Sequence, residues 1–250
     1  MDSMVNDIKI LAIIPARGGS KSLPRKNIRL LHGIPLIAYS IAAGLQAKKV
    51  NRVIVSTDDK EIAEIARKWG AEVPFMRPSE IAQDDTTDLP VFQHALKWLF
   101  KHENYKPNII VQLRPTSPLR PLGCVDNAID ILLKNKADSV RTVIPSGQNP
   151  YKMWRINKKG YMTPLLSVPG IAEPYNMPRQ KLPSTYWQTG HIDVIRYETI
   201  VNKNSMSGKN ILSLILDPIY AVDIDTQTNL NNAEKVMDNP KLPIIRPSVP

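Results

Sequence analysis

A short basic loop near the start of the chain has the residue types most suited to chemistry. It follows an apolar run at residues 8–14, typical of a buried strand, and contains two adjacent glycines, Gly18 and Gly19. Glycine lets the backbone turn its N–H groups toward one point, and cations around it add positive charge there. The sequence therefore predicts a polyphosphate cradle. Its residues are Ala16, Arg17, Gly18, Gly19, Ser20 and Lys21, followed by Arg25 and Lys26.

Two common nucleotide-binding motifs do not account for this loop. A P-loop requires Gly-x-x-x-x-Gly-Lys-Ser/Thr, whereas Ser20 precedes Lys21 here and Pro15 occupies the position of the first glycine. A Rossmann fingerprint requires Gly-x-Gly-x-x-Gly, which two adjacent glycines do not supply. The other alternative is a basic surface turn. Paired glycines and four cations directly after a buried strand favour the phosphate site.

A pair of carboxylates lies near the other end of the sequence. Asp223 and Asp225 flank Ile224 at the end of a predicted strand, residues 219–224. Side chains alternate along a strand, so we expect both carboxylates on one side. Such hard oxygen ligands suit Mg²⁺, which keeps waters and shares substrate phosphates. The alternative is a solvated strand end where Asp225 caps a helix at Thr226, and the two roles are compatible.

The apolar pattern predicts the elements that position these groups. Through the first 140 residues, strand-like runs alternate with segments whose apolar residues recur every three or four positions. Such units imply an α/β fold with a mostly parallel, doubly covered sheet, and ligands bind beyond the carboxyl ends of its strands. The predicted strands are residues 8–14, 52–56, 71–76, 108–113 and 139–144, and the predicted helices include residues 37–45, 62–69, 92–99 and 122–132.

The pattern changes after residue 145. Residues 146–187 contain many prolines and no sustained periodicity, but aromatic side chains such as Trp154, Tyr175 and Trp187 are typical of an interface. A disordered linker is the weaker alternative because of these aromatics. We expect an α/β domain at 8–145 and 188–238, an irregular arm at 146–187 and a loose tail at 239–250, with strands at 192–195 and 219–224 and a helix near 226–237.

The composition limits the classes of function. A net charge of +10 favours an anionic partner, either nucleic acid or small molecules with phosphate or carboxylate groups. A nucleic-acid-binding protein would need cations and aromatics clustered on one face, whereas the richest cationic cluster lies in a tight glycine loop. The single cysteine, Cys124, the polar and acidic first residues and the absence of a long apolar run favour a soluble cytoplasmic protein without a secretory signal. We expect it to bind neither nucleic acid nor membrane.

The residues Arg-Pro-Thr-Ser-Pro-Leu-Arg at 114–120 complete a specific set with the glycine loop and the aspartate pair. Together they resemble the acylneuraminate cytidylyltransferase family, the CMP-sialic acid synthetases and relatives that act on other nonulosonic acids. The resemblance covers nearly the whole chain, about residues 10–234. It implies a Rossmann-like nucleotidyltransferase fold, CTP and a nonulosonic acid as substrates, and Mg²⁺ as cofactor. It also implies a homodimer or tetramer in which the arm packs on a second protomer.

The resemblance implies roles for individual residues. The expected catalytic residues are Arg17, Lys21 and Asp223, of which the two cations would stabilise the phosphates and the departing pyrophosphate. The expected metal ligands are Asp223 and Asp225. Nucleotide binding would use Ala16, Arg17, Gly18, Gly19, Ser20, Lys21, Asn27, Arg77 and Thr87. Acceptor binding would use Arg114, Lys152, Arg179 and Gln188, with Lys152 and Arg179 acting in cis or across a dimer.

Three positions depart from the sialic acid synthetases. Ser22 stands where many relatives have glycine, Arg114 where they usually have glutamine, and Asp193 where they have tyrosine. The last two lie on the acceptor side, so the acceptor stays open among sialic, legionaminic, pseudaminic and related acids. His191 is expected to be packed and hydrogen-bonded rather than to bind the acceptor. A CMP-Kdo-type synthetase and a non-catalytic relative remain as alternatives, and the retained Arg17, Lys21 and aspartate pair argue against the second.

Overall fold

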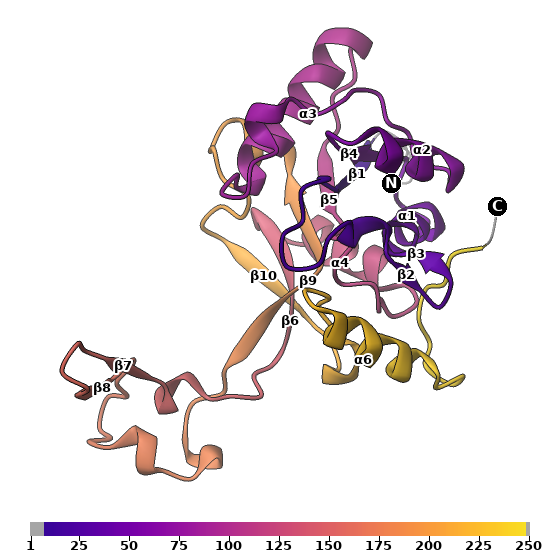
Figure 1. Ribbon diagram of the computed structural model, residues 1–250. Helices are drawn as coiled ribbons and strands as arrows, with labels where there is room; N and C mark the ends of the chain where they lie inside the picture. The colour runs from indigo at the N-terminus through magenta and orange to yellow at the C-terminus, as the bar shows by residue number, and fades with distance from the viewer. Residues whose placement is uncertain (1–7, 249–250) are drawn as a thin grey trace.

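A six-stranded sheet forms the centre of the computed structural model, which describes residues 8–248 (Figure 1). The strands are β1 (Ile10–Pro15), β4 (Arg52–Ser56), β5 (Ile109–Gln112), β6 (Ser139–Pro145), β9 (Tyr186–Arg196) and β10 (Ile211–Ile215), and a separate hairpin pairs β2 (Leu30–Leu31) with β3 (Ile34–Pro35). The order is β10-β6-β9-β5-β1-β4. Strand β9 runs antiparallel to both neighbours, and the other pairs are parallel. The predicted mostly parallel sheet is confirmed.

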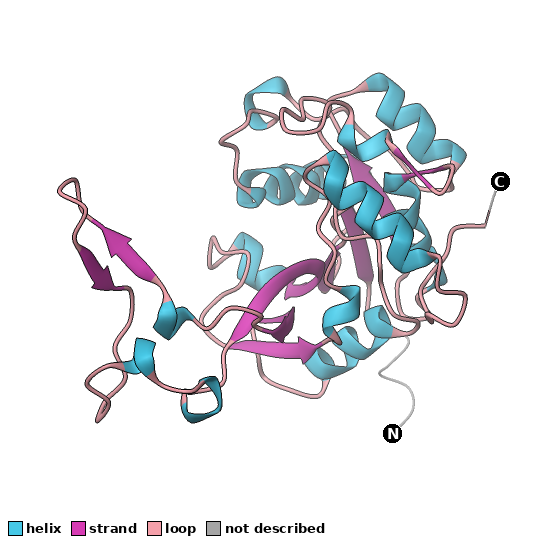
Figure 2. Ribbon diagram, turned by 60° about the horizontal axis from the view of Figure 1, so that its bottom comes forward, coloured by secondary structure: helices cyan, strands magenta, loops and turns pink. Residues whose placement is uncertain are grey.

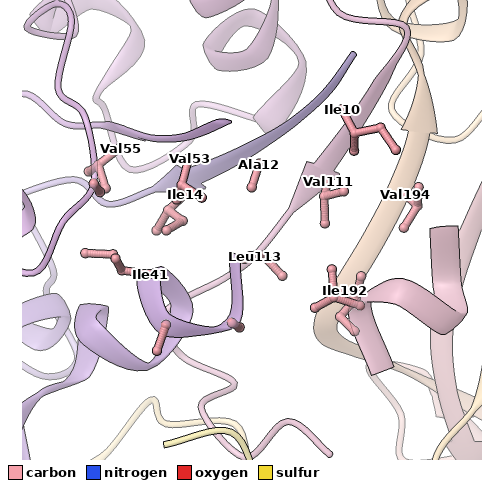
Figure 3. Close-up of a cluster of buried hydrophobic side chains, with 14 of the residues drawn as sticks. Ile10, Ala12, Ile14, Ile41, Val53, Val55, Val111, Leu113, Ile192 and Val194 are labelled. Atoms are coloured by element: carbon pink, nitrogen blue, oxygen red, sulfur yellow. The ribbon is translucent and has the colours of Figure 1, made fainter. Parts of the chain in front are cut away.

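Helices cover both faces of this sheet (Figure 2). They are α1 (Leu36–Gln46), α2 (Lys60–Lys68), α3 (Asp88–Glu103), α4 (Cys124–Leu133), α5 (Tyr197–Val201) and α6 (Gln227–Met237). Because β1 is apolar on both sides, Ile14 packs in a core with α1, α2 and α4, whereas Ile13 packs with α3 and α5. Figure 3 shows the first core, where β1, β4, β5 and β9 meet α1. The sheet is therefore doubly covered, as predicted.

One wrong prediction is the strand at residues 71–76. The only pairing there is a single bridge between Glu72 and Ile54 of β4. Pro74 follows two residues later and lacks the N–H that would continue the ladder. The apolar residues of this stretch are instead buried as part of a loop, since Ala71, Val73 and Phe75 all lie in the two cores.

The strand predicted at residues 219–224 is also wrong. Asp217 accepts a hydrogen bond from the N–H of Ile219 (2.9 Å), and Pro218 fixes the backbone, so a 3₁₀ turn forms at Pro218–Tyr220. The chain then continues without regular structure to α6. The two carboxylates of this segment are thus placed by a loop rather than by a strand.

The sheet is larger at one edge than the sequence predicted. Strand β9 begins at Tyr186 rather than at residue 192, because residues 186–188 continue to pair with β6 across an irregularity between Arg141 and Val143. Strand β10 and helix α5 were not predicted at all. Leu212 and Leu214 of β10 pack toward the core while Ile211 and Ile215 are exposed, the alternation expected of an edge strand.

Between β6 and β9 the chain leaves the sheet and forms an arm, which projects from the helical body in both views (Figures 1 and 2). It contains a small hairpin, β7 (Trp154–Ile156) with β8 (Met162–Pro164), and several 3₁₀ turns. Trp154 packs against Tyr175 with ring centroids 4.5 Å apart. Several apolar side chains of the arm stay exposed, namely Ile156, Tyr161, Met162 and Leu166.

The described part of the C-terminal segment is not the loose tail that we expected. Leu242, Ile244 and Ile245 are buried. The backbone of this segment also bonds to the segment before α4, since Ile245 N–H donates to the Arg120 carbonyl (2.8 Å) and Leu122 N–H to the Pro243 carbonyl (3.1 Å). Its prolines exclude a helix but allow an extended segment that covers the core.

Some predictions concern the chain ends. Residues 1–7, for which we predicted no secretory signal, lie outside the described residues, as do residues 249–250. Across residues 8–248, none of the helices combines the length and the apolar character that crossing a bilayer requires.

Candidate active site

The basic loop after β1 is fixed by carboxylates that follow β4. Gly18 N–H donates to Asp58 Oδ1 (3.0 Å), and Arg25 forms ion pairs with Asp59 and Glu61. Asp59 is the N-cap of α2, where its side chain accepts from Ile62 N–H. Arg25 therefore fastens the loop to α2, and it is not among the residues that line the cavity described below.

Gly18 approaches Asp59 so closely that a larger residue does not fit without a shift. A Cβ there would lie 2.7 Å from Asp59 Oδ2, whereas a Cβ on Gly19 would meet nothing within 4 Å. Overpacking of this kind costs about 1–3 kcal/mol, and it would displace the loop that carries Arg17 and Lys21 into the cavity wall. We expect Gly18→Ala to weaken CTP binding about tenfold in calorimetry and the matched variant Gly19→Ala to leave it unchanged. Equal losses in both variants would contradict this role of Gly18.

A cavity of about 210 Å³ opens beyond the carboxyl ends of β1 and β5. Its walls come from the basic loop, the segment that precedes α3 and the residues that follow β5. Of the predicted site residues, it is lined by Arg17, Ser20, Lys21, Asn27, Arg77 and Arg114. Ala16, Gly18, Gly19 and Thr87 do not line it, although each adjoins a residue that does. This is the edge at which ligands bind in parallel α/β sheets.

Two of the residues that line the cavity, Arg77 and Asn27, are buried and polar. Arg77 is 6% exposed, and its guanidinium donates from Nε to Ser56 Oγ (3.1 Å) and from Nη2 to the Ser56 carbonyl. Burial lowers its pKa to about 10, so it remains charged at neutral pH. Asn27 donates to the Arg17 carbonyl (2.8 Å). Within residues 8–248 no carboxylate forms an ion pair with Arg77, so its charge is available to a ligand.

The two predicted metal ligands do not line this cavity, but each contacts a residue that does: Asp223 contacts Thr116, and Asp225 contacts Lys26. Ile224 is fully buried, and its N–H donates to the carbonyl of the cavity residue Thr116 (2.8 Å), which anchors the aspartates on either side. Burial and the nearby charge of Asp225 raise the pKa of Asp223, against a hydrogen bond from Thr116. Asp225 pairs with Lys26 Nζ (2.6 Å). Thr226, not Asp225, is the N-cap of α6, in a reciprocal capping box with Asn229.

These groups fit the chemistry of a bound Mg²⁺. Within residues 8–248 no cluster of three or more His, Cys, Asp or Glu side chains is arranged to hold a metal. Mg²⁺ often takes only one or two protein carboxylates, because waters and substrate phosphates complete its shell. Desolvation and then the charge of Asp225 raise the pKa of Asp223, and a cation held by these aspartates would oppose both effects.

Of the predicted acceptor-side residues, Arg114 lies in the cavity wall. It forms an ion pair with Asp88, with Nη2 2.5 Å from Oδ2. Asp88 also accepts from Gln112 Nε2 (3.1 Å), so it links the first turn of α3 to the end of β5. Asp88 itself lines the cavity and was missed by the sequence analysis, because only the fold brings it opposite Arg114.

Lys152 and Arg179 belong to the arm and do not line the cavity. Lys152 ends a 3₁₀ turn at Pro150–Lys152 and is exposed. Arg179 donates to the Ser146 carbonyl and lines a separate hollow of about 480 Å³ at the base of the arm. Their predicted contact with an acceptor therefore has no support within one protomer.

Gln188 belongs to a row of polar side chains that crosses the sheet, here called the polar row. Its members are Asp88, Arg114, Asp193, Arg141 and Gln188. Gln188 accepts from Arg141 Nη1 (2.8 Å), and Arg141 Nε lies 3.7 Å from Asp193 Oδ1 on the paired strand. Asp193 is buried, which raises its pKa against the charges of Arg141 and Arg114, and its Oδ1 has no hydrogen-bond partner. The departure at Asp193 thus places a carboxylate between two arginines.

Arg120 holds the 114–120 segment in place through three hydrogen bonds. It is fully buried, and its guanidinium donates to the His191 carbonyl (2.8 Å), Ser40 Oγ (3.1 Å) and the Arg114 carbonyl (2.7 Å). Burial lowers its pKa to about 10. Since these acceptors lie on β9, α1 and the loop after β5, Arg120 fixes the position of Arg114 in the cavity wall.

His191 is packed and hydrogen-bonded, as expected. It is 1% exposed, and Nε2 bonds to the Tyr220 carbonyl (2.8 Å). Burial and the charge of Arg120 lower its pKa from 6.5 to about 4. The unfolded chain therefore binds more protons than the folded one between these values, so stability is present above pH 6.5 and falls as the pH drops toward 4.

We expect His191→Gln, which keeps an N–H donor for Tyr220, to flatten this loss of stability in urea unfolding between pH 7 and pH 4. The exposed His102 provides the control variant, His102→Gln, which should retain the wild-type slope. An unchanged slope in His191→Gln would show that other groups cause the acid sensitivity.

The side chain of Asp84 is a second group that the sequence analysis missed, since the resemblance implied only a backbone contact with the nucleoside near residues 84–87. Its carboxylate forms ion pairs with Arg17 Nη1 (2.8 Å) and with Lys21. Lys21 and then Arg17 lower the pKa of Asp84. No sequence pattern identifies it, because it lies in a polar loop far along the chain from both cations.

Comparison with known proteins identifies the family. Residues 11–168 match the family described as Cytidylyltransferase. The chain belongs to this cytidylyltransferase family. It is 34% identical over 234 residues to CMP-N,N'-diacetyllegionaminic acid synthase of Legionella pneumophila, covering 92% of this chain and 97% of that protein. It is 30% identical over 226 residues to post-translational flagellin modification protein B of Campylobacter coli, covering 90% and 94%.

A solved structure shares the fold of this cytidylyltransferase. It is CMP:2-keto-3-deoxy-manno-octonic acid synthetase complexed with CTP, with a TM-score of 0.67 and 17% identity over 92% of this chain and 98% of that one. At this identity the similarity concerns the fold alone. The cavity at the carboxyl ends of β1 and β5 is therefore the candidate active site of a nucleotidyltransferase.

Proposed function

We propose that this cytidylyltransferase converts CTP and a nonulosonic acid into the CMP-linked sugar and pyrophosphate. The supporting observation is one cavity that is lined by five cations and lies next to a carboxylate pair. The cations are Arg17, Lys21, Lys26, Arg77 and Arg114. Asp223 contacts the lining residue Thr116, and Asp225 pairs with the lining residue Lys26. The names of the relatives, which include a CMP-N,N'-diacetyllegionaminic acid synthase, support an acceptor of this class.

In the proposed reaction the anomeric hydroxyl of the sugar attacks the α-phosphorus in line with the departing pyrophosphate. Arg17 and Lys21 bind the phosphates and stabilise the charge that develops on the leaving group. Arg77 and Asn27 hold the cytosine and ribose, so the α-phosphorus is presented at a fixed place. Mg²⁺ held by Asp223 and Asp225 would neutralise phosphate charge and favour loss of the hydroxyl proton. Positioning and electrostatics carry most of the rate.

We further propose that the acceptor lies along the polar row from Arg114 to Gln188. Arg114 offers donors to a sugar carboxylate or hydroxyls, and Gln188 offers an exposed side-chain amide at the other end of the row. Lys152 and Arg179 would complete this pocket from the arm of a second protomer in a homodimer or tetramer. The exposed apolar side chains of the arm support such an interface, and light scattering of the purified protein would give the oligomeric state. We place the enzyme in the cytoplasm, where the single cysteine, Cys124, stays reduced.

The experiment that tests this function is pyrophosphate release with Mg²⁺ and a panel of nonulosonic acids. We expect release with CTP and at least one acid, and none with ATP, GTP or UTP. The panel contains N-acetylneuraminic, N,N'-diacetyllegionaminic and pseudaminic acids, with Kdo as the acid of the alternative reaction. Release with Kdo alone would replace the proposed acceptor class, and absence of release with every acid would reject the proposed reaction.

A further inference from the structure

The cations of the phosphate site already have an internal anionic partner. Arg17 and Lys21 both pair with Asp84, one on each of its carboxylate oxygens. Asp84 lies in the segment between a 3₁₀ turn at Ser79–Ile81 and α3, and its neighbours Gln83 and Thr86 line the cavity. The carboxylate therefore occupies the cation cluster in which a polyphosphate would bind.

The geometry of these contacts allows the Asp84 carboxylate to be replaced by a ligand at Arg17 and Lys21. The Asp84 side chain is 39% exposed and that of Lys21 is 82% exposed, so both ion pairs are open to water and contribute little stability. The turn that contains Asp84 is closed mainly by two hydrogen bonds between Gln83 and Thr86, at 3.1 and 3.3 Å, so it does not depend on the Asp84 side chain. A triphosphate also forms charge-assisted hydrogen bonds with these cations, and it offers them more charged oxygens than one carboxylate does.

Other carboxylates near the loop do not have this arrangement. Asp59 and Asp58 hold Arg25 and the backbone of Gly18, contacts that fix the loop rather than occupy the cavity. Asp225 pairs with Lys26, and Asp88 pairs with Arg114, each with a single cation. Among the described residues, Asp84 alone joins the two cations that we assign to the triphosphate.

We propose that Asp84 is an internal counter-ion that competes with the β- and γ-phosphates for Arg17 and Lys21 and returns to them when pyrophosphate leaves. This inference rests on the proposed function of the site. It gives Asp84 two effects: it weakens the binding of any ligand that needs both cations, and it speeds the release of pyrophosphate by replacing it. CMP, which has no β- or γ-phosphate, should be insensitive to Asp84.

The test compares Asp84→Asn with Asp85→Asn in calorimetry with CTP, CMP and pyrophosphate, with inorganic tripolyphosphate as a probe that needs no nucleoside. Asp85 is an exposed neighbour with no ion pair among the described residues, so it controls for the loss of one negative charge. We expect Asp84→Asn to bind CTP, pyrophosphate and tripolyphosphate about three- to tenfold more tightly than Asp85→Asn, with equal CMP affinity. Pyrophosphate should also inhibit turnover of Asp84→Asn at lower concentrations.

Equal affinities in the two variants would overturn the proposal. Weaker polyphosphate binding by Asp84→Asn would also overturn it, because Asp84 would then hold the cations in position instead of competing for them. Thermal unfolding of both variants checks that the fold is kept. A wild-type protein that binds tripolyphosphate but not CTP would reject the proposed function, and tripolyphosphate would still decide the role of Asp84.

Discussion

Replacement of Asp223 by asparagine is expected to lower kcat by more than about 100-fold and to leave the fold intact. Loss of a residue that merely supports a metal ligand costs about 10–100-fold, so loss of a ligand should cost more. The amide keeps the size of the side chain but removes the charge that attracts Mg²⁺. The anchor of this segment is the buried Ile224, which the substitution does not touch. Turnover is measured by pyrophosphate release at saturating CTP and Mg²⁺.

Two further variants calibrate this result. Asp225→Asn should reduce turnover less, because Asp225 already shares its charge with Lys26. Asp238→Asn removes an exposed carboxylate whose only ion-pair partner among the described residues is His32, and it should leave kcat unchanged. Wild-type turnover in Asp223→Asn would mean that the metal assignment is wrong.

Substitution of Arg120 by methionine is expected to lower the free energy of unfolding by about 3–5 kcal/mol. Methionine fills much of the space but leaves two buried acceptors without this donor, the His191 carbonyl and Ser40 Oγ, and each unsatisfied group costs about 1–3 kcal/mol. It also removes one of the two hydrogen bonds that the Arg114 carbonyl accepts, the other being from Ser117 N–H. The loss of the buried charge itself offsets part of this cost. A domain is stable by only about 5–15 kcal/mol, so the effect should be large in urea unfolding.

The exposed Arg155 of the arm supplies the control, Arg155→Met, which should change stability by less than about 0.5 kcal/mol. If Arg120→Met were as stable as this control, Arg120 would not be the residue that fixes the 114–120 segment. Arg114 belongs to that segment and its carbonyl accepts a hydrogen bond from Arg120. In folded Arg120→Met we therefore expect the KM for the acceptor to rise more over its wild-type value than the KM for CTP.

The parts of the fold that could be predicted are those in which local pattern and burial agree. Strands β1, β4 and β5 are buried on both faces and therefore read as continuous apolar runs. Residues 71–76 are also mostly apolar and meet the edge strand β4, but the pairing is a single bridge at Glu72 because Pro74 cannot continue it. The short edge strand β10 and the burial of the C-terminal segment depend on neighbours distant in sequence.

The sequence predicts the site residues that belong to a local motif. It does not predict those whose role arises from an ion pair with a residue distant in the sequence. The glycine loop and the aspartate pair stand out as local patterns. Arg17, Ser20 and Lys21 of the loop line the cavity, and Asp223 contacts the lining residue Thr116. Asp84 and Asp88 are ordinary loop and helix-start carboxylates in the sequence. Their roles are visible only in the fold, where Asp84 forms ion pairs with Arg17 and Lys21, and Asp88 forms one with Arg114.

The most direct test of the proposed reaction follows the phosphorus atoms of CTP. CTP labelled at either the α- or the γ-phosphorus is incubated with Mg²⁺, the enzyme and the acid that gives pyrophosphate release, and the products are separated. The proposed reaction predicts that the α-label appears in a product with the mass of the CMP-linked acid and the γ-label in pyrophosphate. Transfer of the γ-label to the sugar, or hydrolysis of CTP without a sugar product, would contradict it.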